Sequence, residues 1–328
     1  MNRRHFLRAA AGAAAVPFLG CGDGGPSLLN SSYDATRELY RRINRLFTER
    51  HRVKVRPSHG GSGSQARAVI DGLPADVLTL ALWPDTDAAH KAGLIDAGWE
   101  DRFPHRSCPY TSTIVFVVRE GNQHNIHNWD DLAARPDLSI IAANPKTSGA
   151  AKLGLLACWG SVVTRGGSDK EAEALVKAVY RRVPALESSS RAATVTFARK
   201  KIGDVHLTWE NEAYLEVKEA RGGLTVIHPP QSILAEPHVA VLDANARRHG
   251  TVELAEAYLR FLYDPAAQDV IAEESYRPTT PEAAAKNASR FGAVERFGIE
   301  RVTPGGWQEA QAKFFADGGV FDRVYTSG

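Results

Sequence analysis

Small polar residues recur where an apolar, strand-like run gives way to a helical pattern. Ser62 follows "VKVRPSHGG", Ser148 follows "LSIIAANPKT", and Ser190 opens "SRAATVTFARK". The first backbone amides of a helix have no partner within the helix and carry the positive end of its dipole, so they bind anions readily. Taken alone, each serine is more readily explained as the cap of its own helix. These serines and the amides beside them could still donate hydrogen bonds to an anion. No single turn establishes that they do.

Four further residues share this placement. Asp34 stands near the start of a helix expected in "ATRELYRRINRLFTERH", Gly149 and Ala150 begin the helix after Ser148, and Trp209 ends the strand-like run "VHLTW". In open α/β sheets, ligands bind outside the carboxyl ends of the strands, where these turns are found. The positions therefore predict one ligand site shared by several turns.

Catalytic patterns are missing from the same sequence. It has no HExxH, GxSxG or Walker A motif, and "GGSGS" lacks the lysine of a nucleotide phosphate loop. The eleven histidines do not gather at metal-ligand spacing, and His59 is expected to be a structural hydrogen-bonding residue rather than a base. Glu210 and Glu212 do not share a helical face. We therefore expect a binding protein without catalytic residues, metal or cofactor.

The elements that must position these turns alternate between strand-like and helix-like segments, which predicts an α/β fold with largely parallel sheets. With 328 residues, 43% hydrophobic and 24% charged, the chain can bury a sizeable core and is expected to form two lobes. Lys and Arg number 40 against 38 Asp and Glu and are scattered. This distribution argues against a nucleic-acid partner.

The first 26 residues are read as an export signal and a tether for a lipid anchor. "MNRRHFLRAAAGAAAVPFLGCGDGG" has a basic start and an apolar run too short to span a bilayer. Its paired arginines resemble a twin-arginine signal, and "FLGC" resembles a lipoprotein box with Cys21 as the lipidated residue. The alternative is a plain cleaved signal. In an oxidising compartment Cys108 and Cys158 could form a disulfide, but their surroundings suit small buried residues equally well.

Nine stretches together resemble the periplasmic sulfate-binding proteins that feed ABC-type sulfate permeases, the prokaryotic sulfate/thiosulfate-binding protein family. They run in family order from about Leu28 to Asp322, nearly the whole mature chain. They are "LLNSSYDATRELY", "SHGGSGSQA", "ADVLTLAL", "PYTSTIVFVVR", "NPKTSGAAK", "GDVHLTWENEA", "SILAEPHVAV", "YRP" and "GGWQEAQAKFFADGGVFD".

The resemblance implies a two-lobed type II periplasmic-binding-protein fold, each lobe a mixed, mainly parallel sheet flanked by helices, closing over one anion. Two crossover strands are expected near "PYTSTIV" and "AEPHVAV". Lobe one would comprise residues 27–113 plus 233–328, and lobe two residues 114–232. The protein would be a periplasmic or otherwise extracytoplasmic monomer, with sulfate and the membrane and ATPase subunits of a permease as its partners.

The resemblance also implies a set of anion contacts, mostly backbone amides, with the Ser148 hydroxyl and the Trp209 indole N–H. They are Asp34, Ser62, Ser148, Gly149, Ala150, Ser190 and Trp209. His59, Lys152 and Arg191 would act from behind them. The family usually has glycine where Ala150 stands, and a small residue other than serine at Ser190. A side chain is tolerated there if only the amide is used and the side chain points away from the anion.

Selectivity follows from counting protons. Sulfate has no proton at neutral pH, whereas phosphate keeps at least one, so a site made only of donors favours sulfate. Thiosulfate or another tetrahedral oxyanion is the nearest alternative ligand, and pocket volume near Ala150 and Ser190 would discriminate it. An extracytoplasmic ester hydrolase would need a nucleophile or metal that the sequence does not offer. A sensor or adhesion protein on the same fold would differ in its genomic neighbours.

Overall fold

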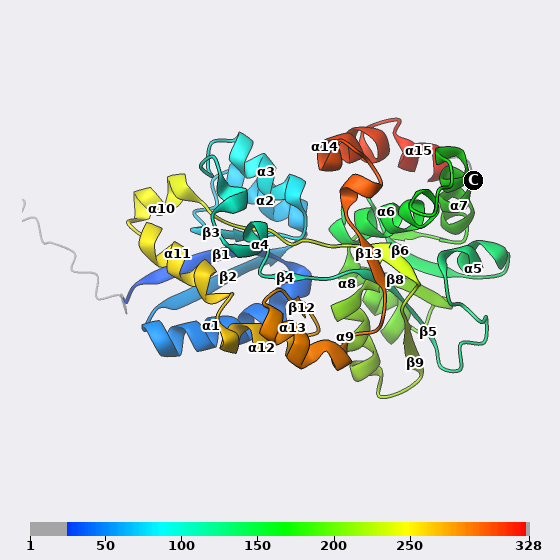
Figure 1. Ribbon diagram of the computed structural model, residues 1–328, viewed down its shortest axis with the longest axis horizontal. Coiled ribbons are helices and arrows are strands. Elements are labelled where there is room, and N and C mark those ends of the chain that lie inside the picture. The colour runs from blue at the N-terminus through cyan, green and yellow to red at the C-terminus, as the bar shows by residue number, and fades with distance from the viewer. Residues whose placement is uncertain (1–24, 326–328) are drawn as a thin grey trace, which may run out of the picture.

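Two α/β lobes lie side by side in the computed structural model, which describes residues 25–325 (Figure 1). The α/β class and the two-lobed architecture are therefore confirmed. The export signal and Cys21 lie outside the described residues. Within the described range, no helix combines the length and hydrophobicity needed to cross a bilayer.

Lobe one is built on a four-stranded sheet in the order β11-β3-β1-β2, in which β1 pairs in parallel with β2 and β3. β11 runs antiparallel to β3 because the chain enters it from the other lobe. The strands are β1 (Ser27–Tyr33), β2 (Lys54–Gly60), β3 (Val77–Thr79) and β11 (Val239–Val241). The helices are η1 (Asp34–Thr36), α1 (Arg37–His51), α2 (Ser62–Ile70), α3 (Trp83–Lys91), η2 (Trp99–Asp101), α4 (Pro104–Ser107), α10 (Asp243–His249), α11 (Val252–Phe261), α12 (Pro265–Glu273) and α13 (Pro281–Asn287).

Lobe two has a five-stranded sheet in the order β7-β6-β8-β5-β9. β6 pairs in parallel with β7 and β8, whereas β5, which arrives from lobe one, is antiparallel to β8 and β9. The strands are β5 (Ile114–Arg119), β6 (Ile140–Ala143), β7 (Leu186–Glu187), β8 (Val205–Trp209) and β9 (Leu224–Ile227). The helices are α5 (Trp129–Ala134), α6 (Gly149–Val163), α7 (Asp169–Tyr180), α8 (Ser190–Thr194), its continuation η3 (Val195–Arg199), and α9 (Glu210–Ala220).

The chain passes between the lobes on neighbouring strands. Ser112 and Ala235 form an antiparallel bridge with two backbone hydrogen bonds of 3.0 Å, so the two crossovers expected from the sequence lie against each other. Short two-stranded sheets continue on either side, β4 (Tyr110–Thr111) with β12 (Arg277–Pro278), and β10 (Gln231–Ile233) with β13 (Glu295–Phe297).

The C-terminal segment differs from the expected division, which assigned residues 233–328 to lobe one. After β12 the chain crosses a third time, and β13 and the helices that follow it pack on lobe two (Figure 1). The aromatic ring of Phe314 meets Trp159 of α6 edge-on at 4.9 Å, and Phe321 meets Tyr180 of α7 at 5.9 Å. These apolar contacts hold the segment there. Before the crossing, η4 (Ala288–Arg290) packs on α13, and after β13 the segment contains η5 (Ile299–Arg301), α14 (Gly306–Ala310), η6 (Gln311–Phe315) and α15 (Val320–Tyr325).

Each lobe has its own hydrophobic core. In lobe one, Leu39, Ile43 and Phe47 form the buried face of α1 and pack with residues of α11 and α12. In lobe two, α6 is buried along most of its length because β5, β10 and α7 surround it. The cysteines Cys108 and Cys158 are both buried free thiols.

Candidate anion site between the lobes

Helix starts from opposite lobes meet at the cleft without side-chain caps. η1 and α2 of lobe one, and α6 of lobe two, begin with no side-chain hydrogen bond to their first amides. By contrast, α5 and α7 in lobe two each carry a complete capping box, from Asn128 and Ser168. Unpaired amides at a helix start need an outside acceptor. The starts of η1, α2 and α6 are therefore available to an anion, whereas at the start of α8 the Ser189 hydroxyl accepts from the Ala192 amide and leaves the Ser190 amide uncapped.

Contacts between segments bring the expected site residues close together. Ser148 Oγ lies 3.1 Å from Ser190 Oγ, and α8 packs against η1, which begins at Asp34. The Trp209 ring lies 5.9 Å from that of Tyr33, the residue before Asp34. Ser62 Oγ accepts a hydrogen bond of 3.1 Å from the amide of Ala81, which in turn faces Gly149. Residues from five different segments thus surround the same place.

Glycine at position 149 lets the two lobes approach closely. A Cβ at this position would lie 3.3 Å from the Leu82 side chain and 3.4 Å from the Cβ of Ala81, both in lobe one. Similarly, a Cβ at Gly61 would lie 3.8 Å from the carbonyl oxygen of Thr147 in lobe two. The small residues of "SHGGSGSQ" and "TSGA" therefore form the line along which the lobes meet.

The turn between β2 and α2 is short, with only Gly61 between the two elements. β2 continues to Gly60 because its ladder with β1 extends to the Tyr33–Gly60 pair, and α2 already begins at Ser62. Gly60 is required here, since a Cβ would lie 2.6 Å from the side-chain nitrogen of Gln65. Gln65 in turn accepts hydrogen bonds from Ser31 and Ser58. This packing fixes the direction in which α2 starts.

Trp209 is only 2% exposed, and its indole N–H makes no hydrogen bond to a residue within 25–325. An indole N–H is a donor that nearly always finds a partner when buried. The backbone here is fixed, because the amide of Glu210 donates to the Thr113 carbonyl oxygen at 3.0 Å. Trp209 therefore offers a positioned donor that the protein itself leaves unused.

Two acidic groups near the site, Asp34 and Asp85, have polar partners. Arg37 donates to the Asp34 carboxylate at 2.8 Å, and both residues lie on the wall of the groove between the lobes. Burial raises the pKa of Asp85 on α3, and a hydrogen bond with the Ser62 hydroxyl lowers it in part. Ser62 accordingly has its backbone amide, rather than its hydroxyl, free for a ligand.

The three residues expected behind the contacts have different environments. Lys152 on α6 donates to Gln311 at 3.3 Å and lies 5.3 Å from the Phe315 ring centre, and burial lowers its pKa. His59 shares a 2.5 Å hydrogen bond with Ser32, and burial with the nearby Arg37 lowers its pKa to about 4, so it is neutral at pH 7. Arg191 is exposed beside Ser190. None of these three is shown to touch a ligand.

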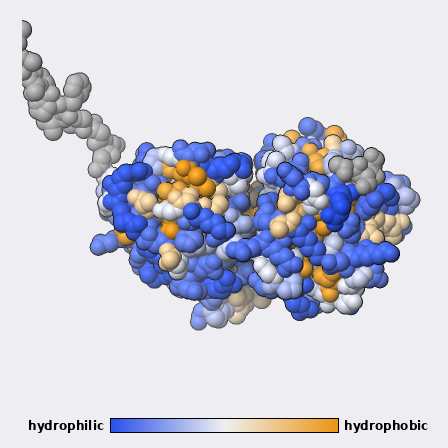
Figure 2. Space-filling view, turned by 90° about the horizontal axis from the view of Figure 1, so that it is seen from above, coloured by the Kyte–Doolittle hydropathy of each residue, from blue (hydrophilic) through white to orange (hydrophobic). Residues whose placement is uncertain are grey.

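A groove of about 660 Å³ opens between α1 of lobe one and α8 and α9 of lobe two, with Asp34 and Ser190 on its walls. Figure 2 shows the two lobes separated by a furrow, with a mostly hydrophilic surface on both. The hydroxyl of Tyr276 links the two lobes at the groove. It donates to the Ala35 carbonyl oxygen of lobe one at 2.8 Å and accepts from Asn211 of lobe two at 3.0 Å. The groove connects the candidate site with solvent.

Glu212 lies in this groove, 6% exposed and without an ion pair or hydrogen bond from its carboxyl group to any described residue. Burial, with a smaller contribution from Glu216, raises its pKa from the ordinary 4.5 to about 7, against the opposing effect of Arg191. The folded protein therefore keeps a proton that the unfolded chain has released between those two pH values.

Replacing Glu212 by glutamine should remove a pH-dependent loss of stability. The raised pKa contributes stability below about pH 4.5 that is lost as the pH rises to about 7. Glu212→Gln should therefore raise the free energy of unfolding above pH 7 by up to about 3 kcal/mol, with little change near pH 4.5. Urea unfolding at both pH values measures it. Glu219→Gln, an exposed residue of the same groove, is the control, and equal effects of both variants would contradict the prediction.

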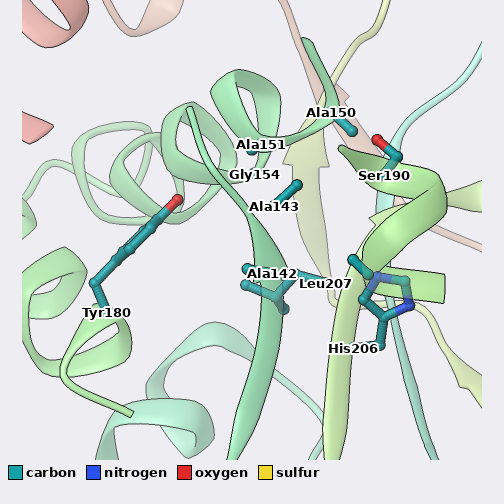
Figure 3. Close-up of a pocket in the computed structure, with 10 residues that line it drawn as sticks. Ala142, Ala143, Ala150, Ala151, Gly154, Tyr180, Ser190, His206 and Leu207 are labelled. Atoms are coloured by element: carbon teal, nitrogen blue, oxygen red, sulfur yellow. The ribbon is translucent and has the colours of Figure 1, made fainter. Parts of the chain in front are cut away.

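A second, much smaller cavity of about 10 Å³ lies behind Ala150 and Ser190, between α6, α8 and the strands β6 and β8 (Figure 3). Its walls include the small residues Ala142, Ala143 and Gly154. That volume is at the lower limit for one water molecule. Within residues 25–325, no three His, Cys, Asp or Glu side chains are arranged to hold a metal ion.

Sequence reasoning missed three features of the site. The hydroxyl pair of Ser148 and Ser190, the Asp85 carboxyl group beside Ser62, and the ion pair between Glu210 and Arg277 join segments that are far apart in the chain. No local pattern reports such pairs. Only Glu210, which directly follows Trp209, lies beside an expected contact in the sequence, and nothing local marks Asp85 or Arg277.

Comparisons with known proteins agree with this architecture. Residues 28–277 match the family described as bacterial extracellular solute-binding protein. The chain is 46% identical over 305 residues to the sulfate-binding protein of Escherichia coli K12, covering 90% of this chain and 92% of that protein. It is 41% identical over 322 residues to the thiosulfate-binding protein of Pseudomonas aeruginosa, covering 96% of each. The solved sulfate-binding protein of Mycobacterium tuberculosis H37Rv superimposes with a TM-score of 0.81 at 30% identity, covering 89% of this chain and 100% of that one.

Proposed function

Because the chain belongs to the family of bacterial extracellular solute-binding proteins, we propose that it captures inorganic sulfate between its lobes and delivers it to an ABC-type permease. The observation that carries the proposal is the meeting of uncapped helix starts from both lobes at one point. A dianion there would bind both lobes at once, and so favour the closed arrangement over an open one.

The proposed contacts are all uncharged donors. Backbone amides come from Asp34, Ser62, Gly149, Ala150 and Ser190, and side-chain donors from Ser148 and Trp209. Many short hydrogen bonds and the positive ends of helices can disperse the charge of a dianion, so no lysine or arginine is needed in contact with it. Lys152 and Arg191 would add long-range attraction only.

Export and the partner complete the proposal. The N-terminal segment would direct the protein out of the cytoplasm by a twin-arginine route, and lipidation at Cys21 would hold it near the membrane. A monomer tethered in this way would present both lobes to the membrane and ATPase subunits of a permease.

Thiosulfate is the second candidate ligand. It is favoured by the similarity to the Pseudomonas thiosulfate-binding protein and by the small cavity lined by Ala150 and Ser190. Thiosulfate carries a larger sulfur atom in place of one oxygen of sulfate, and the small side chains of Ala150 and Ser190 would let that atom approach this wall. The two ligands would share the same donors.

Isothermal titration of the purified protein, dialysed free of anions, tests the proposal. Sulfate, thiosulfate, phosphate and molybdate are titrated in turn. Tight one-to-one binding of sulfate is the expected result, and stronger binding of thiosulfate would replace sulfate by the second candidate. Folded, ligand-free protein that binds neither anion would overturn the proposed function.

A further inference from the structure

Two hydroxyl groups face each other at the candidate site. Ser148 Oγ, at the start of α6, and Ser190 Oγ, at the start of α8, lie 3.1 Å apart, and either can be the donor. Ser148 does not use its hydroxyl to cap α6. Figure 3 shows the Ser190 side chain directed toward the beginning of α6 at Ala150. The pair therefore belongs to the wall that would face an anion.

The pair can present either a donor or an acceptor to the ligand. Each hydroxyl carries one proton and two lone pairs, and one proton lies between the two oxygens. When Ser190 donates to Ser148, the Ser148 proton is directed at the ligand. When Ser148 donates to Ser190, the Ser148 oxygen can accept a hydrogen bond from a protonated ligand. Ser190 then directs its own proton into the open groove, which it also lines.

Two of the carboxyl groups near the site have partners, and the third, Glu212, lies in the same groove without one among the described residues and is the alternative acceptor. The Asp34 carboxylate is bound by Arg37 at 2.8 Å, and the Asp85 carboxyl group interacts with the Ser62 hydroxyl. With alanine at position 190, the Ser148 proton would have only the ligand to bond to. The hydroxyl of Ser190 removes that restriction.

We propose, resting on the proposed function, that the Ser148–Ser190 pair admits tetrahedral dianions that keep one proton, hydrogen phosphate and hydrogen arsenate, in addition to sulfate. Ser190 is then a specificity-determining residue. The fully deprotonated anion takes the donor arrangement of the pair, and the protonated anion takes the acceptor arrangement. One site thus satisfies both ligands without a buried carboxylate as the acceptor.

Calorimetric titration at about pH 8 with sodium sulfate and sodium phosphate tests the proposal on the wild-type protein and on Ser190→Ala, Ser190→Thr and Ser189→Ala. An unpaired buried hydroxyl costs about 1–3 kcal/mol, so Ser190→Ala should weaken phosphate relative to sulfate by roughly 5- to 150-fold. Ser190→Thr should keep the wild-type ratio. Ser189→Ala should keep it too, because Ser189 only caps α8 through the Ala192 amide at 3.2 Å.

Three results would overturn the proposal and leave the proposed function standing. They are sulfate binding with no phosphate binding by the wild-type protein, an unchanged sulfate-to-phosphate ratio in Ser190→Ala, and a loss of phosphate in Glu212→Gln but not in Ser190→Ala. The last result would make Glu212, in the same groove, the acceptor. Folded wild-type protein that binds neither sulfate nor thiosulfate would overturn the inference and the proposed function together.

Discussion

Replacing Trp209 by phenylalanine should weaken sulfate binding by roughly 10- to 150-fold, with little effect on the fold. A hydrogen bond to a charged group contributes about 1.5–3 kcal/mol, and the indole N–H forms none with a described residue. Phenylalanine keeps an aromatic ring near Tyr33, 5.9 Å away, so the apolar contact between the lobes is retained. Calorimetric titration with sulfate measures the loss.

Trp159→Phe is the matched control. The Trp159 indole is also buried and also lacks a hydrogen-bond partner among the described residues, but it packs against Phe314 on the far side of α6. Removing this second orphaned N–H should leave sulfate affinity unchanged. Equal losses in the two variants would mean that the Trp209 effect arises from packing, and would remove the indole from the proposed contacts.

Much of the fold could be predicted from local patterns. The apolar face of Leu39, Ile43 and Phe47 specified α1, and the small residues after β6 specified the start of α6. What local patterns do not contain is which lobe a segment joins. Phe314 and Phe321 identify the C-terminal segment as amphipathic, yet only the shapes of α6 and α7 place it on lobe two rather than lobe one.

The candidate site divides in the same way. Positions of helix starts follow from sequence, because a strand-like run followed by serine and glycine marks each of them. The use of each hydroxyl does not, since Ser62 is engaged within lobe one whereas Ser148 meets a serine 42 residues away. Such pairings depend on strand order, which brings β6 beside β7 and β8 without any trace in the local sequence.

Replacing Arg277 by methionine should lower the free energy of unfolding by about 3–5 kcal/mol, because it leaves a buried carboxylate short of its main partner. Arg277, on β12 beside lobe one, bonds both oxygens of Glu210 on α9 of lobe two, at 2.6 and 2.7 Å. Glu210 is fully buried, and its pKa is lowered because the bonds from His228 and Arg277 outweigh the effect of burial. Urea unfolding measures the change.

Two further variants separate this buried pair from ordinary surface charge. Arg247→Met breaks an exposed bidentate pair with Asp96, at 2.8 and 3.0 Å, and should change the free energy of unfolding far less than Arg277→Met does. Arg277→Met with Glu210→Gln removes both charges and should recover part of the stability lost in the single variant. A double variant no more stable than Arg277→Met would contradict the buried-charge explanation.

Because Glu210 directly follows Trp209, the ion pair also fixes the start of α9, so Arg277→Met should weaken sulfate binding even where the protein remains folded.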